Sequence, residues 1–219
     1  MRKFLNMSDI FEEILQILKG GIDRIISQRR SYKINTLLKS IEYPNQVKDG
    51  YTLLISVTIH GDYFMIEELL KRGANPNILL NFGSSNHTAL TIAIEQGRID
   101  IIDLLFQYNV NVNQKNIWDQ TPLHIACSLG LDNGVDVVSR LINNNADVNQ
   151  IDFLGDTPLH YAARNGACNE ILDLLFINGA QINNINNHGK TPLMIALDLW
   201  YDDTAERLIS YGCDLVINK

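Results

Sequence analysis

Histidine, cysteine and adjacent carboxylates are the side chains of this sequence that could catalyse a reaction or bind a metal ion. The five histidines lie far apart along the chain: His60, His87, His124, His160 and His188. The three cysteines lack the short spacing of a metal site. Asp202 and Asp203 are adjacent, and we expect them to be solvated in a turn between helices. The sequence has no glycine-rich phosphate loop, no His-Glu-x-x-His and no Gly-x-Ser-x-Gly, so it predicts neither an enzyme nor a cofactor or metal site.

A short pattern that begins with threonine recurs five times. It reads Thr-Pro-Leu-His at residues 121–124 and 157–160, and altered copies begin at Thr52, Thr88 and Thr191. The leading threonines are 36, 33, 36 and 34 residues apart. A recurrence close to 33 residues predicts an array of repeated helical units, each of which buries its apolar face against its neighbours.

Each unit continues with the same signals in the same order. Nine residues after the threonine, four units carry a glycine, which suits the left-handed end of a helix: Gly61, Gly97, Gly130 and Gly166. Four units close with an asparagine: Asn77, Asn113, Asn149 and Asn183. The last unit departs from the pattern, because Trp200 stands where the glycine is expected. With these motifs, residues 50–219 resemble the ankyrin-repeat family.

The resemblance implies an all-α ankyrin-repeat solenoid of helix-turn-helix units, with β-turn or hairpin fingers and an N-terminal helical cap. The five repeats would occupy residues 50–82, 83–116, 117–152, 153–186 and 187–219. The threonine would cap the first helix of each unit, and the leucine would be buried between units. The resemblance also implies that His124 and His160 bond to nearby backbone, and that each closing asparagine holds a turn through backbone hydrogen bonds.

Residues 1–49 differ from the repeats in charge and pattern. They carry nine Lys or Arg and six Asp or Glu, and apolar residues at helical spacing run from Ile10 to Ile41. We expect this segment to be a helical cap formed by a degenerate repeat. An alternative stays open, because residues 9–30 resemble an F-box, which would make the chain a ubiquitin-ligase substrate adaptor. The Leu-Pro that begins an F-box is absent here.

The resemblance places a binding surface on the fingers and on the groove beneath them. Adjacent fingers each show an apolar pair, and exposed clusters of this kind mark contact sites between proteins. The alternative is that these side chains fold down against neighbouring fingers. The predicted fingertip residues are Ile117, Trp118, Phe153, Leu154 and His188. The predicted groove residues are Glu95, Ser128, Tyr161, Arg164 and Asp198, of which Tyr161 and Arg164 are the expected polar anchors.

Charge narrows the class of partner. The chain has a formal net charge of −7, and residues 50–219 alone carry nineteen Asp or Glu against nine Lys or Arg. Such a surface repels phosphate backbones and attracts a basic protein, although the same charge would also serve solubility alone.

The remaining expectations concern location and modification. The sequence shows no apolar stretch long enough for a membrane span, and we expect a cytoplasmic monomer. The frequent Asn and Ile suggest a low-GC genome; in an intracellular bacterium, the chain would resemble a secreted effector in the host cytosol. The stretch that ends at Asn149 resembles ankyrin sequences modified by asparaginyl hydroxylases.

Overall fold

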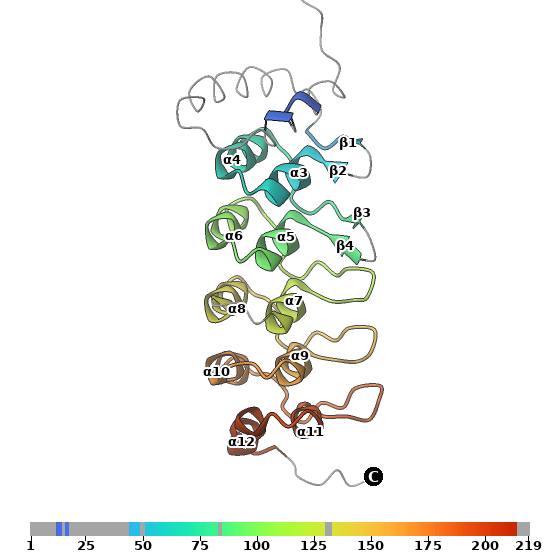
Figure 1. The fold of residues 1–219 in the computed structure, drawn as a ribbon, viewed down its shortest axis with the longest axis vertical. Helices are drawn as coiled ribbons and strands as arrows, with labels where there is room; N and C mark the ends of the chain where they lie inside the picture. Colours follow the sequence, from blue (N-terminus) through green and yellow to red (C-terminus); the bar gives the residue numbers. More distant parts are fainter. Residues whose placement is uncertain are drawn as a thin grey trace, which may run out of the picture.

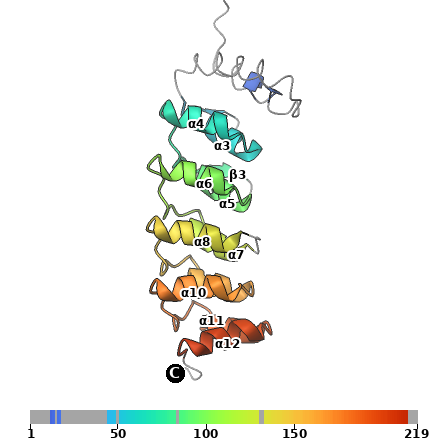
Figure 2. The ribbon, with the colours of Figure 1, turned by 90° about the vertical axis from the view of Figure 1, so that its left-hand side faces the viewer.

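Pairs of helices stacked along one axis form the body of the chain. The computed structural model describes residues 12–14, 16–17, 44–48, 51–82, 85–129 and 133–213. The first helices of the five pairs are α3 (Leu53–His60), α5 (Ala89–Glu95), α7 (Pro122–Ser128), α9 (Pro158–Arg164) and α11 (Pro192–Asp198). The second helices are α4 (Tyr63–Lys71), α6 (Ile99–Phe106), α8 (Gly134–Asn143), α10 (Asn169–Ile177) and α12 (Asp202–Ser210). Each pair lies beside the next, with all second helices on one side (Figures 1 and 2).

Short hairpins and turns project from the opposite side of the stack, next to the first helices (Figure 1). Strands β1 (Val47–Lys48) and β2 (Tyr51–Thr52) pair antiparallel, with Val47 opposite Thr52. Strands β3 (Leu80–Phe82) and β4 (Ser85–His87) form a second antiparallel hairpin, with Leu80 opposite His87. We call these hairpins and the corresponding turns before α7, α9 and α11 the fingers. The predicted all-α solenoid with hairpin or turn fingers is confirmed.

Some predictions fall on parts of the chain that the structure does not describe. The helical cap and the F-box-like segment of residues 1–49 lie largely outside the described residues, as does the predicted cap glycine Gly130. Asp202 and Asp203, predicted to lie in a turn, are instead the first two residues of α12. Carboxylates favour this position because the first turn of a helix exposes unpaired backbone N–H groups.

The residues of the repeated motif begin the first helices in the predicted way. Thr157 is the N-cap of α9, and its hydroxyl accepts a hydrogen bond from the backbone N–H of His160 at 3.4 Å. Pro158 follows at the first helical position, where no N–H is needed. Threonine stands at the same N-cap position of α3, α5, α7 and α11. The predicted role of the threonine as a cap is therefore confirmed.

A continuous apolar seam joins the pairs. The leucine of the motif is at most 2% exposed in every unit: Leu54, Leu90, Leu123, Leu159 and Leu193. One cluster of buried residues extends from Ile14 to Cys213, through all five pairs. The molecule therefore has no single centre, and each pair is stabilised by the pairs on either side of it.

The closing asparagines tie each unit to the next one. The Asn113 side chain donates to the carbonyl of Asn145 at 3.0 Å and accepts from the N–H of Asp147 at 2.9 Å. Asn77 and Asn149 make the same two bonds, to the turns around residues 109–111 and 179–181. The prediction that these three asparagines bond to backbone in a turn is confirmed, and the structure adds that the turn belongs to the following unit.

Asn45 makes the same pair of bonds one step earlier in the chain. Its side chain donates to the Gly73 carbonyl at 3.3 Å and accepts from the Asn75 N–H at 2.6 Å. The residues before β1 are thus fixed to the first helical pair in the way that one unit is fixed to the next.

Candidate protein-binding surface

One polar side chain at the base of each of the last three fingers shapes the fingertip. The carboxylate of Asp152 accepts hydrogen bonds from the N–H groups of Leu154 and Asp156, both at 2.9 Å. Asn116 and Asn186 do the same for the residues two and four positions after them. All three residues are buried or nearly so: Asn116 is 9% exposed, Asp152 4% and Asn186 5%. Each therefore turns the chain tightly, so that the residues between the two bonds project.

Neighbouring fingers are also bonded to one another through their backbones. The N–H of Phe153 donates to the carbonyl of Trp118 at 3.1 Å, and the N–H of Asn187 donates to the carbonyl of Leu154 at 2.9 Å. The three fingertips therefore form one connected row whose spacing is fixed. A surface built on such a row loses little conformational freedom when a partner binds, which favours affinity.

This row carries large exposed apolar side chains. The rings of Trp118 and Phe153 lie on adjacent fingers with centroids 5.2 Å apart, tilted by 43°, and are 41% and 48% exposed. Ile117, Ile151 and Ile185 are each about half exposed, at 54%, 49% and 53%. We call these five residues the finger patch. The two ring systems pack on each other and still present a face to solvent.

The other fingertip residues take different positions. Leu154 is half-buried and His188 is exposed. Ile151 and Ile185 were not predicted from the sequence as exposed finger residues. Their positions could have indicated it, since each directly precedes the residue that turns its finger.

In the groove, the side chain of Tyr161 contacts two fingers. Its hydroxyl donates to the carboxylate of Asp152 at 2.8 Å and accepts from the Gln120 side-chain amide at 2.6 Å. Its ring meets the ring of His124 edge to face, with centroids 5.3 Å apart. Burial, aided by the bond to Asp152, raises the pKa of the Tyr161 hydroxyl well above its usual range. The hydroxyl is therefore neutral and occupied, and the half-exposed ring is what this residue offers a partner.

Arg164 belongs to a second polar network. Its guanidinium lies 2.6 Å from the carboxylate of Asp156, which is fully buried and also accepts from the Asn186 side chain at 2.6 Å. The Arg164 side chain remains 38% exposed. It thus compensates a buried charge on one side and faces solvent on the other.

Asp156 directly precedes the N-cap threonine of its unit, and Arg164 stands seven residues after that threonine. The residues at these two positions are paired in other units as well. Lys190 lies 3.0 Å from Asp198, which reverses the order of charges seen in Asp156 and Arg164. The His87 ring lies 3.4 Å from Glu95, whose pKa is raised by burial and lowered in part by that histidine. The groove therefore presents a row of polar pairs whose charges differ from unit to unit.

The motif histidines join neighbouring units. The Thr121 N–H donates to Nδ1 of His124 at 3.1 Å, so Nε2 carries the proton and donates to the Asp156 carbonyl, also at 3.1 Å. His160 makes the same bonds, to the Thr157 N–H and the Lys190 carbonyl. Burial lowers the pKa of both imidazoles, which keeps them neutral. The predicted bonding of these histidines to backbone is confirmed.

The described part of the chain provides little for other chemistry. It contains no group of three or more His, Cys, Asp or Glu side chains that could hold a metal ion. Burial raises the pKa of the Cys127 thiol far above its usual range, so the reactive thiolate does not form there. The helices that the structure describes are all too short or too polar to cross a membrane.

The predicted hydroxylation site is occupied by structural bonds. The Asn149 side chain donates to the Gly179 carbonyl at 2.9 Å and accepts from the Gln181 N–H at 2.8 Å. An enzyme that hydroxylates Asn149 would first have to break these two hydrogen bonds to the following unit.

Comparison with known proteins places the fold in a family. The family model for ankyrin repeats (3 copies) matches residues 22–116 and 123–219. An ankyrin repeat protein of Fowlpox virus (strain NVSL) is 34% identical over 95 residues, which is 41% of this chain. This chain spans only 16% of the length of that relative. Ankyrin repeats are in general protein–protein interaction modules. With both matched ranges covering the stacked helical pairs, the chain belongs to the ankyrin-repeat family.

Proposed function

We propose that this chain is a non-catalytic module that captures a partner protein through the finger patch and the adjoining groove. The observation that carries the proposal is the exposed Trp118–Phe153 ring pair on fingers that hydrogen-bond to each other. Tryptophan and other large side chains in a rigid setting supply most of the binding energy of protein interfaces. Among the described residues, no group of three or more His, Cys, Asp or Glu side chains could hold a metal ion.

The groove residues would give the interaction its specificity. Glu95, Ser128, Arg164 and Asp198 occupy the same place in four successive units and differ in charge. The Ser128 hydroxyl donates to the Ile125 carbonyl at 2.7 Å, whereas Arg164 and Asp198 are held in ion pairs with their own fingers. A partner with complementary groups would meet a preformed row of charges. The excess of carboxylates over residues 50–219 favours a partner with a basic surface.

The division of the chain is part of the proposal. We assign five repeats to residues 50–219 and a capping unit to residues 1–49. The bonds of Asn45 support the capping unit, because they repeat the contact that joins one unit to the next. The family match supports it as well, since the match begins at residue 22.

Partner capture by a double variant tests the proposal. The protein, immobilised, is exposed to lysate of its native host, and bound proteins are identified by mass spectrometry. Trp118→Ala with Phe153→Ala should abolish specific capture, since each lost hot spot costs roughly 2 kcal/mol. The matched control is Tyr63→Ala with Phe64→Ala, which removes two aromatic side chains of similar exposure, 40% and 41%, from α4. If the folded finger variant captures the same proteins as the wild type, the assignment of the surface is wrong.

A further inference from the structure

Trp200 has an unusual conformation and exposure. It lies in the turn between α11 and α12 with a φ of +61°, in the left-handed region, and is 85% exposed. At the same place in other units stand Gly61, Gly97 and Gly166, with φ values of +68°, +63° and +57°. A residue with a side chain is strained in this conformation, by about 1–2 kcal/mol. Strain that persists at an exposed aromatic residue is a reason to look for a binding role.

The glycines are required where a following unit covers the turn. A methyl group on Gly166 would come within 3.1 Å of the Tyr201 ring, and one on Gly97 would come within 3.1 Å of the Asn133 side chain. Trp200 belongs to the last helical pair that the structure describes, and no described pair follows it. Its side chain therefore has room that the glycine positions of the earlier units lack.

Leu197 and Leu199 extend the apolar surface beside Trp200, at 50% and 43% exposure. The position of Leu197, six residues after the N-cap threonine, is buried in all earlier pairs, whose first helices each pack against the first helix of the next pair. The residues there are at most 2% exposed: Thr58, Ile94, Cys127 and Ala163. Leu197 thus continues the established interface between units, at an end that none of the described residues covers.

Three acidic side chains follow Trp200 closely in the sequence. Asp202, Asp203 and Glu206 are exposed on α12, directly after the turn. The described part of the chain supplies no ion pair to any of the three. Several carboxylates on the other second helices are paired; for example, Asp103 lies 2.8 Å from Arg140, and Asp173 lies 2.6 Å from Arg207.

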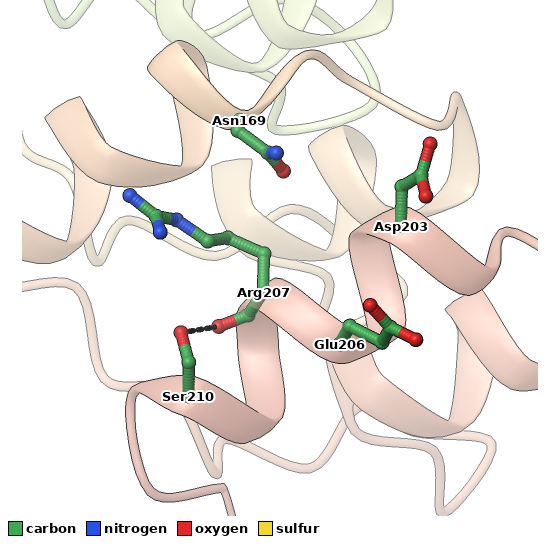
Figure 3. Close-up of a pocket in the computed structure, with 5 residues that line it drawn as sticks. All are labelled: Asn169, Asp203, Glu206, Arg207 and Ser210. Atoms are coloured by element: carbon green, nitrogen blue, oxygen red, sulfur yellow. Dashed lines mark hydrogen bonds between the residues drawn. The ribbon is translucent and has the colours of Figure 1, made fainter.

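A hollow of about 250 Å³ lies between α10 and α12 beside these carboxylates. Its lining residues are Asn169, Asp203, Glu206, Arg207 and Ser210 (Figure 3). The Arg207 guanidinium turns away from Asp203 and Glu206, toward Asp173, so it does not neutralise them. The hollow is therefore an acidic recess of a size that can receive a side chain.

We infer that this end of the stack binds a basic amphipathic segment of a second partner protein. Leu197, Leu199 and Trp200 would contact its apolar side chains, and Asp202, Asp203 and Glu206 would contact its lysines or arginines; we call these six residues the terminal patch. Two properties support this partner. The apolar part continues a surface through which successive helical pairs of this chain pack, and the exposed carboxylates, which have no ion pair among the described residues, favour positive charge. The indole of Trp200 can also hold a cation against its face.

Fluorescence of Trp200 tests the inference directly. The chain has two tryptophans, so Trp118→Phe leaves Trp200 as the only indole that emits. This protein is titrated with a synthetic amphipathic peptide that carries lysine on its polar face, and with a counterpart that carries glutamate at the same positions. The lysine peptide should shift the emission to shorter wavelength and saturate, and the glutamate peptide should not. No shift with the lysine peptide, or equal shifts with both, would overturn the inference.

Variants separate this surface from the finger patch. With a dye-labelled lysine peptide, Trp200→Gly should weaken binding by roughly tenfold or more, which corresponds to the loss of one hot spot. Asp202→Asn with Asp203→Asn and Glu206→Gln should weaken it and reduce its dependence on salt. Trp118→Ala with Phe153→Ala should bind the peptide as the wild type does, because the finger patch takes no part in this binding. If the peptide fails to bind at the terminal patch, the function proposed for the finger patch is not affected. Unchanged affinity in Trp200→Gly, with circular dichroism showing a folded protein, would contradict the terminal patch.

Discussion

The left-handed conformation of Trp200 predicts an order of stability that is the reverse of the usual one. Replacing it by alanine removes the side chain and keeps the strain, whereas replacing it by glycine removes both. In an ordinary conformation the alanine variant would be the more stable, because glycine gains more freedom on unfolding. At Trp200 we expect the glycine variant to be the more stable of the two.

The size of the difference follows from two opposing terms. Relief of the left-handed strain favours glycine by about 1–2 kcal/mol. The greater freedom of glycine in the unfolded chain opposes this by about 0.4–1 kcal/mol. The glycine variant should therefore be more stable than the alanine variant by roughly 1 kcal/mol. The contacts of the indole cancel in this comparison, because both variants lack them.

Two further positions serve as references. Glu206 is exposed inside α12, so Glu206→Ala should be more stable than Glu206→Gly by about 0.5–1 kcal/mol. Gly166 has a φ of +57° and would carry a methyl group 3.1 Å from Tyr201, so Gly166→Ala should be clearly destabilised.

Urea unfolding followed by circular dichroism measures all of these differences on the purified protein. The expected result is a higher midpoint for Trp200→Gly than for Trp200→Ala, and the opposite order at Glu206. If Trp200→Ala is as stable as Trp200→Gly or more so, the turn is not held in the left-handed conformation. The reasoning from strain would then fail.

Three other changes test the contacts between units. Leu159→Ala should lower the free energy of unfolding by about 2–5 kcal/mol, because Leu159 is 1% exposed and the change leaves a cavity; an unmoved urea curve would contradict its interior position. Asn113→Ala removes two bonds to the next unit and should cost about 1–3 kcal/mol, more than Asn144→Ala, whose side chain bonds only within its own helix. Burial lowers the pKa of His124 and His160, so the unfolded chain binds their protons first, and stability should fall as the pH drops below about 6.5. Imidazoles that titrate at or above their ordinary pKa in NMR spectra would refute this.

The repeat architecture could be predicted from the sequence because its signals are local and recur. Threonine caps, first-turn prolines and cap glycines each act within a few residues, and five copies in one register make their order unmistakable. The bonds of the motif histidine followed from the family resemblance in the same way. The turn positions of Asp202 and Asp203 were wrong by a residue or two, because helix ends depend on which turn retains its hydrogen bonds.

Contacts between units were harder to foresee. The hydroxyl of Tyr161 bonds to Gln120, 41 residues earlier, and nothing in the local sequence indicates that partner. The bonds between neighbouring fingers join backbone groups, which leave no trace in residue type. The bonds of Asn45 could have been predicted from its spacing, since it stands 32 residues before Asn77. The residues around Asn45 differ too much from the repeat motif for that spacing to be recognised.

Hydrogen–deuterium exchange on the protein alone and bound to its captured partner tests the central claim most directly. If the finger patch binds the partner, exchange should slow at residues 115–120, 151–156 and 185–190, and the second helices should be unaffected. Slowed exchange confined to the second helices, with the fingers unchanged, would contradict the claim that this protein holds its partner with its fingers.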